Sequence, residues 1–153
     1  MFKPTDTALE DFLNEEPLSD TPAIQPTEIG SILLGILPCT DVLNSSSTPY
    51  PAFVGVRFNF VFPSFPAVME SQIVSIIWRL PPVTYDLELG LLDFTQSPIA
   101  VVPSQVTIDR PTIFVSLHRL LNVSIQTPGL YILAARCNGN ILGSVPIGIE
   151  QGG

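Results

Sequence analysis

Residues 127–149, TPGLYILAARCNGNILGSVPIGI, decide the fold class of this chain. Pro128-Gly129 is a turn signal, and the apolar run 131–137 that follows it is typical of a strand. Asn138-Gly139 then predicts a β-hairpin, because a type I′ turn needs positive φ at both of its central residues. The return strand alternates, and one of its faces is predicted to contain Ile141, Gly143, Val145, Ile147 and Ile149. The stretch therefore predicts a hairpin that closes a β-sandwich.

Several other stretches repeat this alternation of apolar and polar residues. Strands are predicted over residues 29–37, 52–62, 72–80, 83–89, 99–102 and 112–117. The cleanest is 52–62, whose predicted core face contains Val54, Val56, Phe58, Phe60 and Phe62. The 16 prolines and 10 glycines are spread along the chain and mark many turns. Together these patterns predict an all-β, antiparallel sandwich of about seven to nine strands.

The first 28 residues differ from the rest of the chain in charge. They contain seven acidic residues against Lys3, which gives −6, whereas the remainder has seven acidic residues and five arginines, which gives −2. We therefore divide the chain into an extended acidic N-terminal arm at residues 1–28, a β-sandwich domain at residues 29–150 and a tail at residues 151–153.

The arm contains one short helical signal. Thr7 and Glu10 form a capping box at the start of an apolar helical stripe, so a short helix is predicted over residues 8–16. A helix of about two turns is too short to be stable alone in water. Two interpretations stay open: a disordered acidic leader, or a docking arm that inserts its apolar side chains into the groove of a partner. The docking side chains would be Leu9, Phe12 and Leu13.

The composition of the chain argues against some classes of binding partner and some cellular locations. An acidic arm on a nearly neutral body argues against nucleic acid, whose phosphates require clustered Lys and Arg. No apolar run reaches the roughly 18 residues needed to span a bilayer, so no membrane span is predicted. The first 30 residues lack a basic region followed by an apolar one, so no secretory signal peptide is predicted. The expected location is the cytoplasm, or a virion assembled there.

The residues that could perform chemistry are few and scattered. His118 is the only histidine and is predicted to lie at the surface at a strand end, with no G-x-S-x-G nucleophile elbow in the chain. Cys39 and Cys137 are predicted to be reduced, buried thiols, and with His118 they lack the close spacing of a zinc site. Asp86 and Glu88 recur at period two, which is typical of a solvated strand face. We therefore predict a protein that is not an enzyme, with no catalytic, cofactor-binding or metal-binding residues.

Three motifs carry a resemblance to a known fold family. Val115-x-Leu117, Pro128-Gly-x-Tyr131 and the hairpin leading to Leu142-Gly-Ser-Val-Pro146 are together similar to small uncharacterised bacterial β-sandwich proteins of the immunoglobulin-like type, over residues 112–149. In that resemblance Tyr131 stands at the corner that enters strand F. Leu133 stands where antibody-type domains have a cysteine, and Trp78 lies far from Cys39. The resemblance implies a fold and no activity, since this fold hosts many functions.

Because no catalytic site is predicted, we expect the function to depend on contacts made by the protein surface. Charged residues are only 13% of the chain and Lys3 is its only lysine, although lysines commonly guard edge strands against unwanted pairing. Such a chain is expected to cover part of its surface with a protein partner or with a second copy of itself. The candidate contact residues in the body are Phe53, Phe62, Phe65 and Leu142, although these phenylalanines could equally fill the end of the core.

These observations lead to two hypotheses about function. The first is a non-enzymatic structural module, a subunit of a larger assembly that docks through its N-terminal arm. A virion accessory or decoration protein fits this hypothesis by analogy. The second is a cytoplasmic domain that binds a peptide or small molecule through loops at one end of the sandwich.

Overall fold

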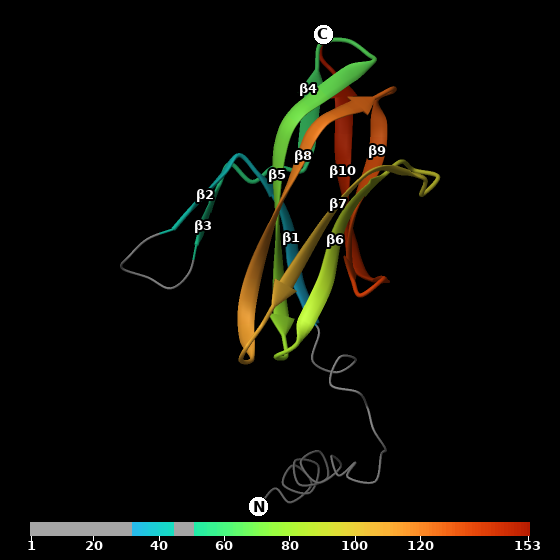
Figure 1. The fold of residues 1–153 in the computed structure, drawn as a ribbon. Helices are drawn as coiled ribbons and strands as arrows, with labels where there is room; N and C mark the ends of the chain where they lie inside the picture. The colour runs from blue at the N-terminus through green and yellow to red at the C-terminus, as the bar shows by residue number, and fades with distance from the viewer. Residues whose placement is uncertain (1–31, 45–50) are drawn as a thin grey trace, which may run out of the picture.

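The computed structural model describes residues 32–44 and 51–153. The predicted arm, its helix over residues 8–16 and the side chains of Leu9, Phe12 and Leu13 lie outside the described residues. Within the described ranges the chain forms ten β-strands in three sheets, so the all-β prediction is confirmed (Figure 1). No helix in these ranges is long and apolar enough to cross a membrane.

The strands follow one another with short connections. They are β1 (Ile32–Cys39), β2 (Asp41–Leu43), β3 (Ala52–Val54), β4 (Asn59–Phe62), β5 (Ala67–Leu80), β6 (Thr84–Leu92), β7 (Pro98–Thr107), β8 (Thr112–Ile125), β9 (Gly129–Cys137) and β10 (Asn140–Gln151). The predicted range of about seven to nine strands is therefore too low for the described part of the chain.

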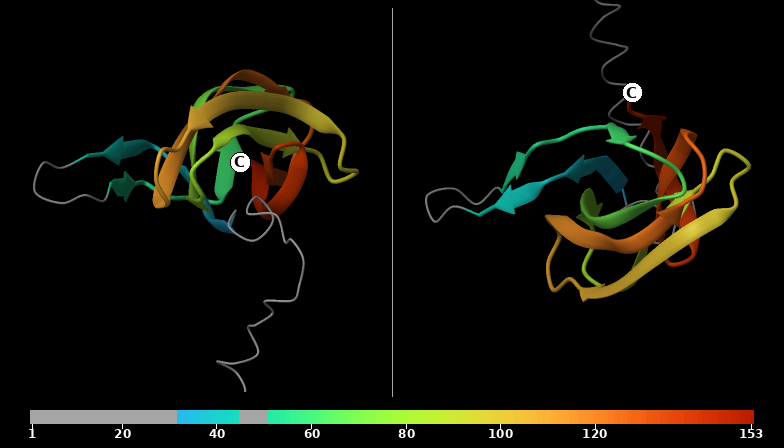
Figure 2. Two further views of the ribbon diagram at one scale, coloured as in Figure 1. Left: turned by 60° about the horizontal axis from the view of Figure 1, so that its bottom comes forward. Right: turned by 90° about the horizontal axis from the view of Figure 1, so that it is seen from above.

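Two larger sheets enclose the core. The first is three-stranded, in the order β1-β5-β8, and the second is five-stranded, in the order β4-β10-β9-β6-β7. The five-stranded sheet curls into a half-barrel, which is clearest when the molecule is seen from above (Figure 2). Neighbouring strands run antiparallel except β4, which pairs with the end of β10 in parallel. The third sheet is the short β2–β3 hairpin, which projects away from the two larger sheets (Figure 2).

The β9–β10 hairpin has the predicted turn. Asn138 and Gly139 have φ values of 50° and 86°, which confirms a turn with positive φ at both central residues. The register then shifts by one residue between Ile141 and Gly143, so Leu142 is an extra residue in a β-bulge. The bulge breaks the predicted single face: Ile141 lies on the exposed side, while Ile147 further along the strand is buried.

The prediction of one strand over residues 52–62 is wrong. Gly55, with a φ of 67°, ends β3, and the chain crosses to a different sheet before β4 begins. Of the predicted core face only Phe60 is buried, Phe62 is half-buried, and the other three side chains are exposed. The alternation was present, but β3 pairs with the projecting β2 and has no core to face. This split and the small hairpin account for the additional strands.

Two other predicted faces form the core. On β5, Val74, Ile76, Trp78 and Leu80 are all buried, as predicted from their alternation. On β6, Tyr85, Leu87 and Leu89 are also buried, whereas Val83 lies before the strand and is exposed. Cys39 on β1 and Cys137 on β9 are buried and form no disulfide, which confirms the prediction for both thiols.

Two tyrosines fix the chain at the entrances to strands of the five-stranded sheet. The Tyr131 hydroxyl donates a hydrogen bond of 2.6 Å to the carbonyl oxygen of Thr127, four residues earlier. The Tyr85 hydroxyl repeats this pattern at the start of β6, donating to the carbonyl oxygen of Pro81 at 2.8 Å. Both rings are buried, so each links the core to the loop that precedes its strand.

Replacement of Tyr131 by Phe is expected to lower the free energy of unfolding by about 1 kcal/mol, because the Thr127 carbonyl loses its donor while the ring stays in the core. Urea denaturation followed by Trp78 fluorescence measures this difference. Tyr85→Phe is the matched variant at the second corner and is expected to cost about as much. An unchanged unfolding midpoint in Tyr131→Phe would contradict a stabilising role for this hydrogen bond.

Candidate binding site

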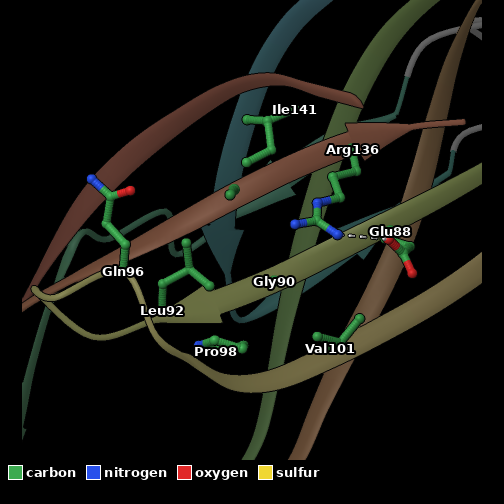
Figure 3. Close-up of a pocket in the computed structure, with 9 residues that line it drawn as sticks. Glu88, Gly90, Leu92, Gln96, Pro98, Val101, Arg136 and Ile141 are labelled. Carbon is green, nitrogen blue, oxygen red and sulfur yellow. Dashed lines mark ion pairs between the residues drawn. The ribbon is translucent and has the colours of Figure 1, made fainter. Parts of the chain in front are cut away.

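A pocket of about 270 Å³ lies on the outer side of the five-stranded sheet. Its floor is formed by Gly90 on β6 and Ala134 on β9, which are directly paired across the sheet. Because these two residues have small side chains and their neighbours are larger, the sheet surface is hollow at this point. The remaining lining residues are Glu88, Leu92, Gln96, Pro98, Val101, Arg136 and Ile141 (Figure 3).

One end of the pocket is charged. Arg136 Nη1 lies 3.7 Å from Glu88 Oε1, and the two residues are paired in register on β9 and β6 (Figure 3). Their side chains are 49% and 32% exposed, so solvent screens the ion pair and its contribution to stability is small. The pair therefore provides polar character at the pocket's edge.

The other end is bounded by the loop that joins β6 to β7, which carries Gln96 (Figure 3). Asp93 organises this loop: its Oδ1 accepts hydrogen bonds from the Thr95 hydroxyl at 2.6 Å, the Thr95 amide at 2.9 Å and the Ser97 amide at 3.0 Å. The Thr95 hydroxyl and the Ser97 amide hold the pKa of Asp93 below its usual value, because they stabilise the charged carboxylate. Gln96 has a φ of 69° and closes this side of the pocket.

The chemistry of this pocket suits a small apolar group. Its lining is mainly apolar. Its volume of about 270 Å³ is slightly smaller than that of the smallest pockets that enclose a drug-sized ligand, which is roughly 300 Å³. Among residues 32–44 and 51–153, no group of three or more His, Cys, Asp or Glu side chains is placed to hold a metal ion. The pocket can accept one apolar side chain whose backbone or polar end lies near Arg136.

A second surface, the outer side of the β1-β5-β8 sheet, is apolar over most of its area. Directly paired residues on this side include Ser75 with Leu117, and Arg79 with Ile32 and Ile113. We call this surface the apolar face. Its positions, which alternate with the core-facing rows, are Ile32, Gly35, Leu37 and Cys39 on β1, Ser71, Ile73, Ser75, Ile77 and Arg79 on β5, and Ile113, Val115, Leu117, Arg119 and Leu121 on β8. Of these, Cys39 and Ser75 are fully buried.

The apolar face is open to solvent along β8. Ile113, Leu117 and Leu121 are 57%, 54% and 59% exposed, and β8 is an edge strand of its sheet. The outer positions of an antiparallel sandwich are usually polar, because only the inner face meets the core. An exposed apolar patch on a folded domain commonly marks an interaction site.

The contact residues predicted from the sequence do not come together. Phe62 and Phe65 lie at one end of the molecule with ring centroids 6.0 Å apart, half-buried against the core. Leu142 lies in the bulge near the start of β10, whereas Phe62 pairs with Gln151 at the end of that strand. Phe53 lies on the projecting hairpin. The structure therefore separates Leu142 from the phenylalanines by most of the length of β10.

Sequence reasoning missed the apolar face, although β5 contains a signal for it. The residues of this strand that alternate with its buried set include Ile73 and Ile77, so both faces of β5 are apolar. If only one face of a strand is covered by the core, the residues on its other, solvent-facing side are expected to be polar. The pocket gave no such signal, because its floor consists of two small residues from strands far apart in the sequence.

The prediction that His118 lies at the surface is wrong. His118 is in the middle of β8, faces inward and is only 1% exposed. Trp78 Nε1 donates to the Ser116 hydroxyl at 2.8 Å, and the same hydroxyl lies 2.9 Å from His118 Nε2. A hydroxyl that accepts from Trp78 can donate its own proton to Nε2, which suits a neutral imidazole. Burial lowers the pKa of His118, and the backbone of Val102 partly opposes this shift.

Comparison with known proteins adds little. No protein-family model and no curated protein matches the sequence. Among solved structures, the chain is similar to Pseudomonas fluorescens alkylpurine DNA glycosylase AlkC, bound to DNA containing an abasic site analog. The match has 10% sequence identity and a TM-score of 0.44, and it covers 79% of this chain. The chain spans only 30% of the length of that glycosylase, and so distant a likeness does not indicate DNA binding.

The buried His118 predicts a pH-dependent stability. Its folded pKa is lower than the unfolded value of about 6.5, so below that pH the unfolded chain binds a proton that the folded chain does not. We expect the free energy of unfolding to fall as the pH drops from 7.5 to 5.5, measured by urea denaturation. His118→Gln has no group that titrates at this position, so its stability is expected to change less across the same range. An equal change in both proteins would contradict this assignment.

The pocket floor predicts a stabilising substitution. A Cβ at Gly90 would meet only Leu92 Cδ2, at 3.7 Å, and glycine inside a strand costs about 0.5–1 kcal/mol relative to alanine. Gly90→Ala is therefore expected to raise the free energy of unfolding by about that amount while making the pocket shallower. Gly139→Ala is the matched control: its φ of 86° requires glycine, so the same change is expected to destabilise by about 1 kcal/mol. Thermal unfolding of both variants measures these effects, and a destabilised Gly90→Ala would show that the floor is already closely packed.

Proposed function

We propose that this chain is a non-enzymatic assembly module, a subunit that associates with copies of itself or with a protein partner in a larger assembly. The observation that carries this proposal is the exposed apolar face, with Ile113, Leu117 and Leu121 along the edge strand β8. Burying such side chains against another protein stabilises an interface by about 25 cal/mol for each Å² of apolar surface removed from water. No lysine lies in the described ranges to discourage association at this edge.

We also propose that the two larger sheets form an immunoglobulin-like sandwich. The strand order supports this: β1-β5-β8 corresponds to strands A, B and E, and β10-β9-β6-β7 corresponds to strands G, F, C and C′. The hydrogen bond of Tyr131 at the entrance to β9 has the form of a tyrosine corner. One departure is that Trp78 lies on β5, the counterpart of strand B, whereas antibody domains have their core tryptophan on strand C.

Within this proposal, a virion accessory or decoration protein is the favoured class of assembly subunit. The argument is an analogy: a small sandwich preceded by an acidic arm of 28 residues suits a subunit that must hold a neighbour. Such a subunit would occupy the cytoplasm or the assembled virion. The fold itself does not select between kinds of assembly.

A second candidate function is supported by the pocket. A cytoplasmic binding domain could place an apolar peptide side chain over Gly90 and Ala134, with Arg136 near the peptide backbone. The small volume and the single charged edge make this candidate weaker than the first, because selective small-molecule sites usually combine a larger cavity with several convergent polar groups.

Light scattering coupled to size-exclusion chromatography tests the assembly function. The wild-type chain is expected to exceed its monomer mass of 16.6 kDa as its concentration is raised. Leu117→Lys places a charge in the apolar face and is expected to shift the chain toward monomer. Leu130→Lys is the matched control, because Leu130 lies on the other sheet, outside the pocket, and is 60% exposed against 54% for Leu117. A wild-type chain that stays monomeric at every concentration, or an equal effect of both substitutions, would refute the proposal.

A further inference from the structure

We infer that the apolar face receives residues 7–16 of the arm of a second copy of this chain. This inference rests on the proposed assembly function and names the surface and the segment that would meet. Two features of the chain have no role in holding the fold together. They are the open apolar sheet face and the acidic segment that contains apolar side chains.

The charges of the two surfaces are complementary. Arg79 and Arg119 are the charged residues among the outward positions of the apolar face, and no acidic residue shares those positions. Within the described part of the chain neither arginine is in an ion pair, and Arg119 Nη1 donates only to the Ser71 hydroxyl, at 2.9 Å. These positions therefore carry two positive charges and no negative one, and the nearest acidic residue along β5 is the exposed Glu70, next to Ser71. Exposed guanidinium groups beside apolar side chains suit a ligand that offers both carboxylates and apolar groups.

The arm segment has this composition. Residues 7–16 read TALEDFLNEE, which combines three large apolar side chains with four carboxylates. The apolar set is Leu9, Phe12 and Leu13, and the acidic set is Glu10, Asp11, Glu15 and Glu16. Insertion of apolar side chains from an acidic segment between exposed arginines would bury apolar surface and pair charges at the same time.

The connection to the body allows this contact. Residues 17–31 separate the segment from Ile32, which itself lies on the apolar face opposite Arg79. Fifteen residues can span up to about 50 Å, enough to cross to a neighbouring copy. Three of these fifteen residues are proline (Pro17, Pro22 and Pro26), and proline-rich linkers in general are semi-rigid spacers. These features favour the face of a second copy over the segment's own.

A symmetric contact between two apolar faces is a poorer solution. Each face would bring Arg79 and Arg119, so four guanidinium groups would enter the contact with no carboxylate among the outward positions. Like charges at an interface oppose association, particularly as water is removed. The acidic arm avoids this cost because it brings the opposite charge.

Disulfide trapping between two full-length variants tests the inference. Phe12→Cys is mixed with Leu117→Cys carrying a tag of different size, and the pair is oxidised under mild conditions. A mixed dimer on a non-reducing gel is expected, at a yield several-fold above that of Phe12→Cys mixed with Leu130→Cys. Cys39 and Cys137 are buried in the body, so each variant alone measures the background from these thiols. Absence of the mixed dimer, or equal yields with Leu117→Cys and Leu130→Cys, would overturn the inference.

Two further variants separate this inference from the proposed function. In the double variant Phe12→Cys/Leu117→Cys, a fast-migrating monomer without dimer would show that the arm covers its own face, which overturns the role of a second copy. In light scattering, Phe12→Glu is expected to reduce assembly as Leu117→Lys does. If assembly survives Phe12→Glu but is lost in Leu117→Lys, the arm is not the occupant, while the assembly function itself stands.

Discussion

The antiparallel pairing of β5 with β8 is the constraint on which the rest of the structure depends. Both strands have 14 residues, and their register places Trp78 opposite Phe114 and Ser75 opposite Leu117. Because side chains alternate across a strand, one register fixes both surfaces of this sheet. The inner surface contains the Trp78–Ser116–His118 chain, and the outer surface is the apolar face. A slip of β8 by one residue would turn Arg119 toward the core and His118 toward solvent.

Local chemistry made part of this fold predictable. The Asn138-Gly139 turn depends on two residues that tolerate positive φ, and the buried rows of β5 and β6 depend on simple alternation. The prediction from alternation was wrong over residues 52–62. A pattern of period two does not reveal that Gly55 turns the chain toward another sheet. The prediction from alternation was also wrong at His118, whose buried Nε2 is paired with the Ser116 hydroxyl, which itself accepts a hydrogen bond from the sequence-distant Trp78.

The candidate sites were harder to predict than the fold, for a physical reason. The pocket exists because Gly90 and Ala134 are small and happen to be paired, and pairing between strands is a property of topology. The apolar face is visible in sequence only as a second apolar row on β5, and that row becomes meaningful once β8 is known to be an edge strand. For Phe62 and Phe65 the sequence left both a surface role and a core role open, and in the structure they pack against the core and each other.

The two outer surfaces of the molecule differ in a way that suits different partners. The side with the pocket also exposes apolar side chains such as Val101 and Ile141, but it carries charges of both signs in the Glu88–Arg136 ion pair. The apolar face offers rows of branched side chains, and its exposed polar side chains are Ser71, Arg79 and Arg119. A surface of that kind gains free energy when it is covered, and its arginines restrict the cover to something acidic. The chain contains an acidic segment with apolar side chains in its own arm, which is why we propose that segment of a second copy as the cover.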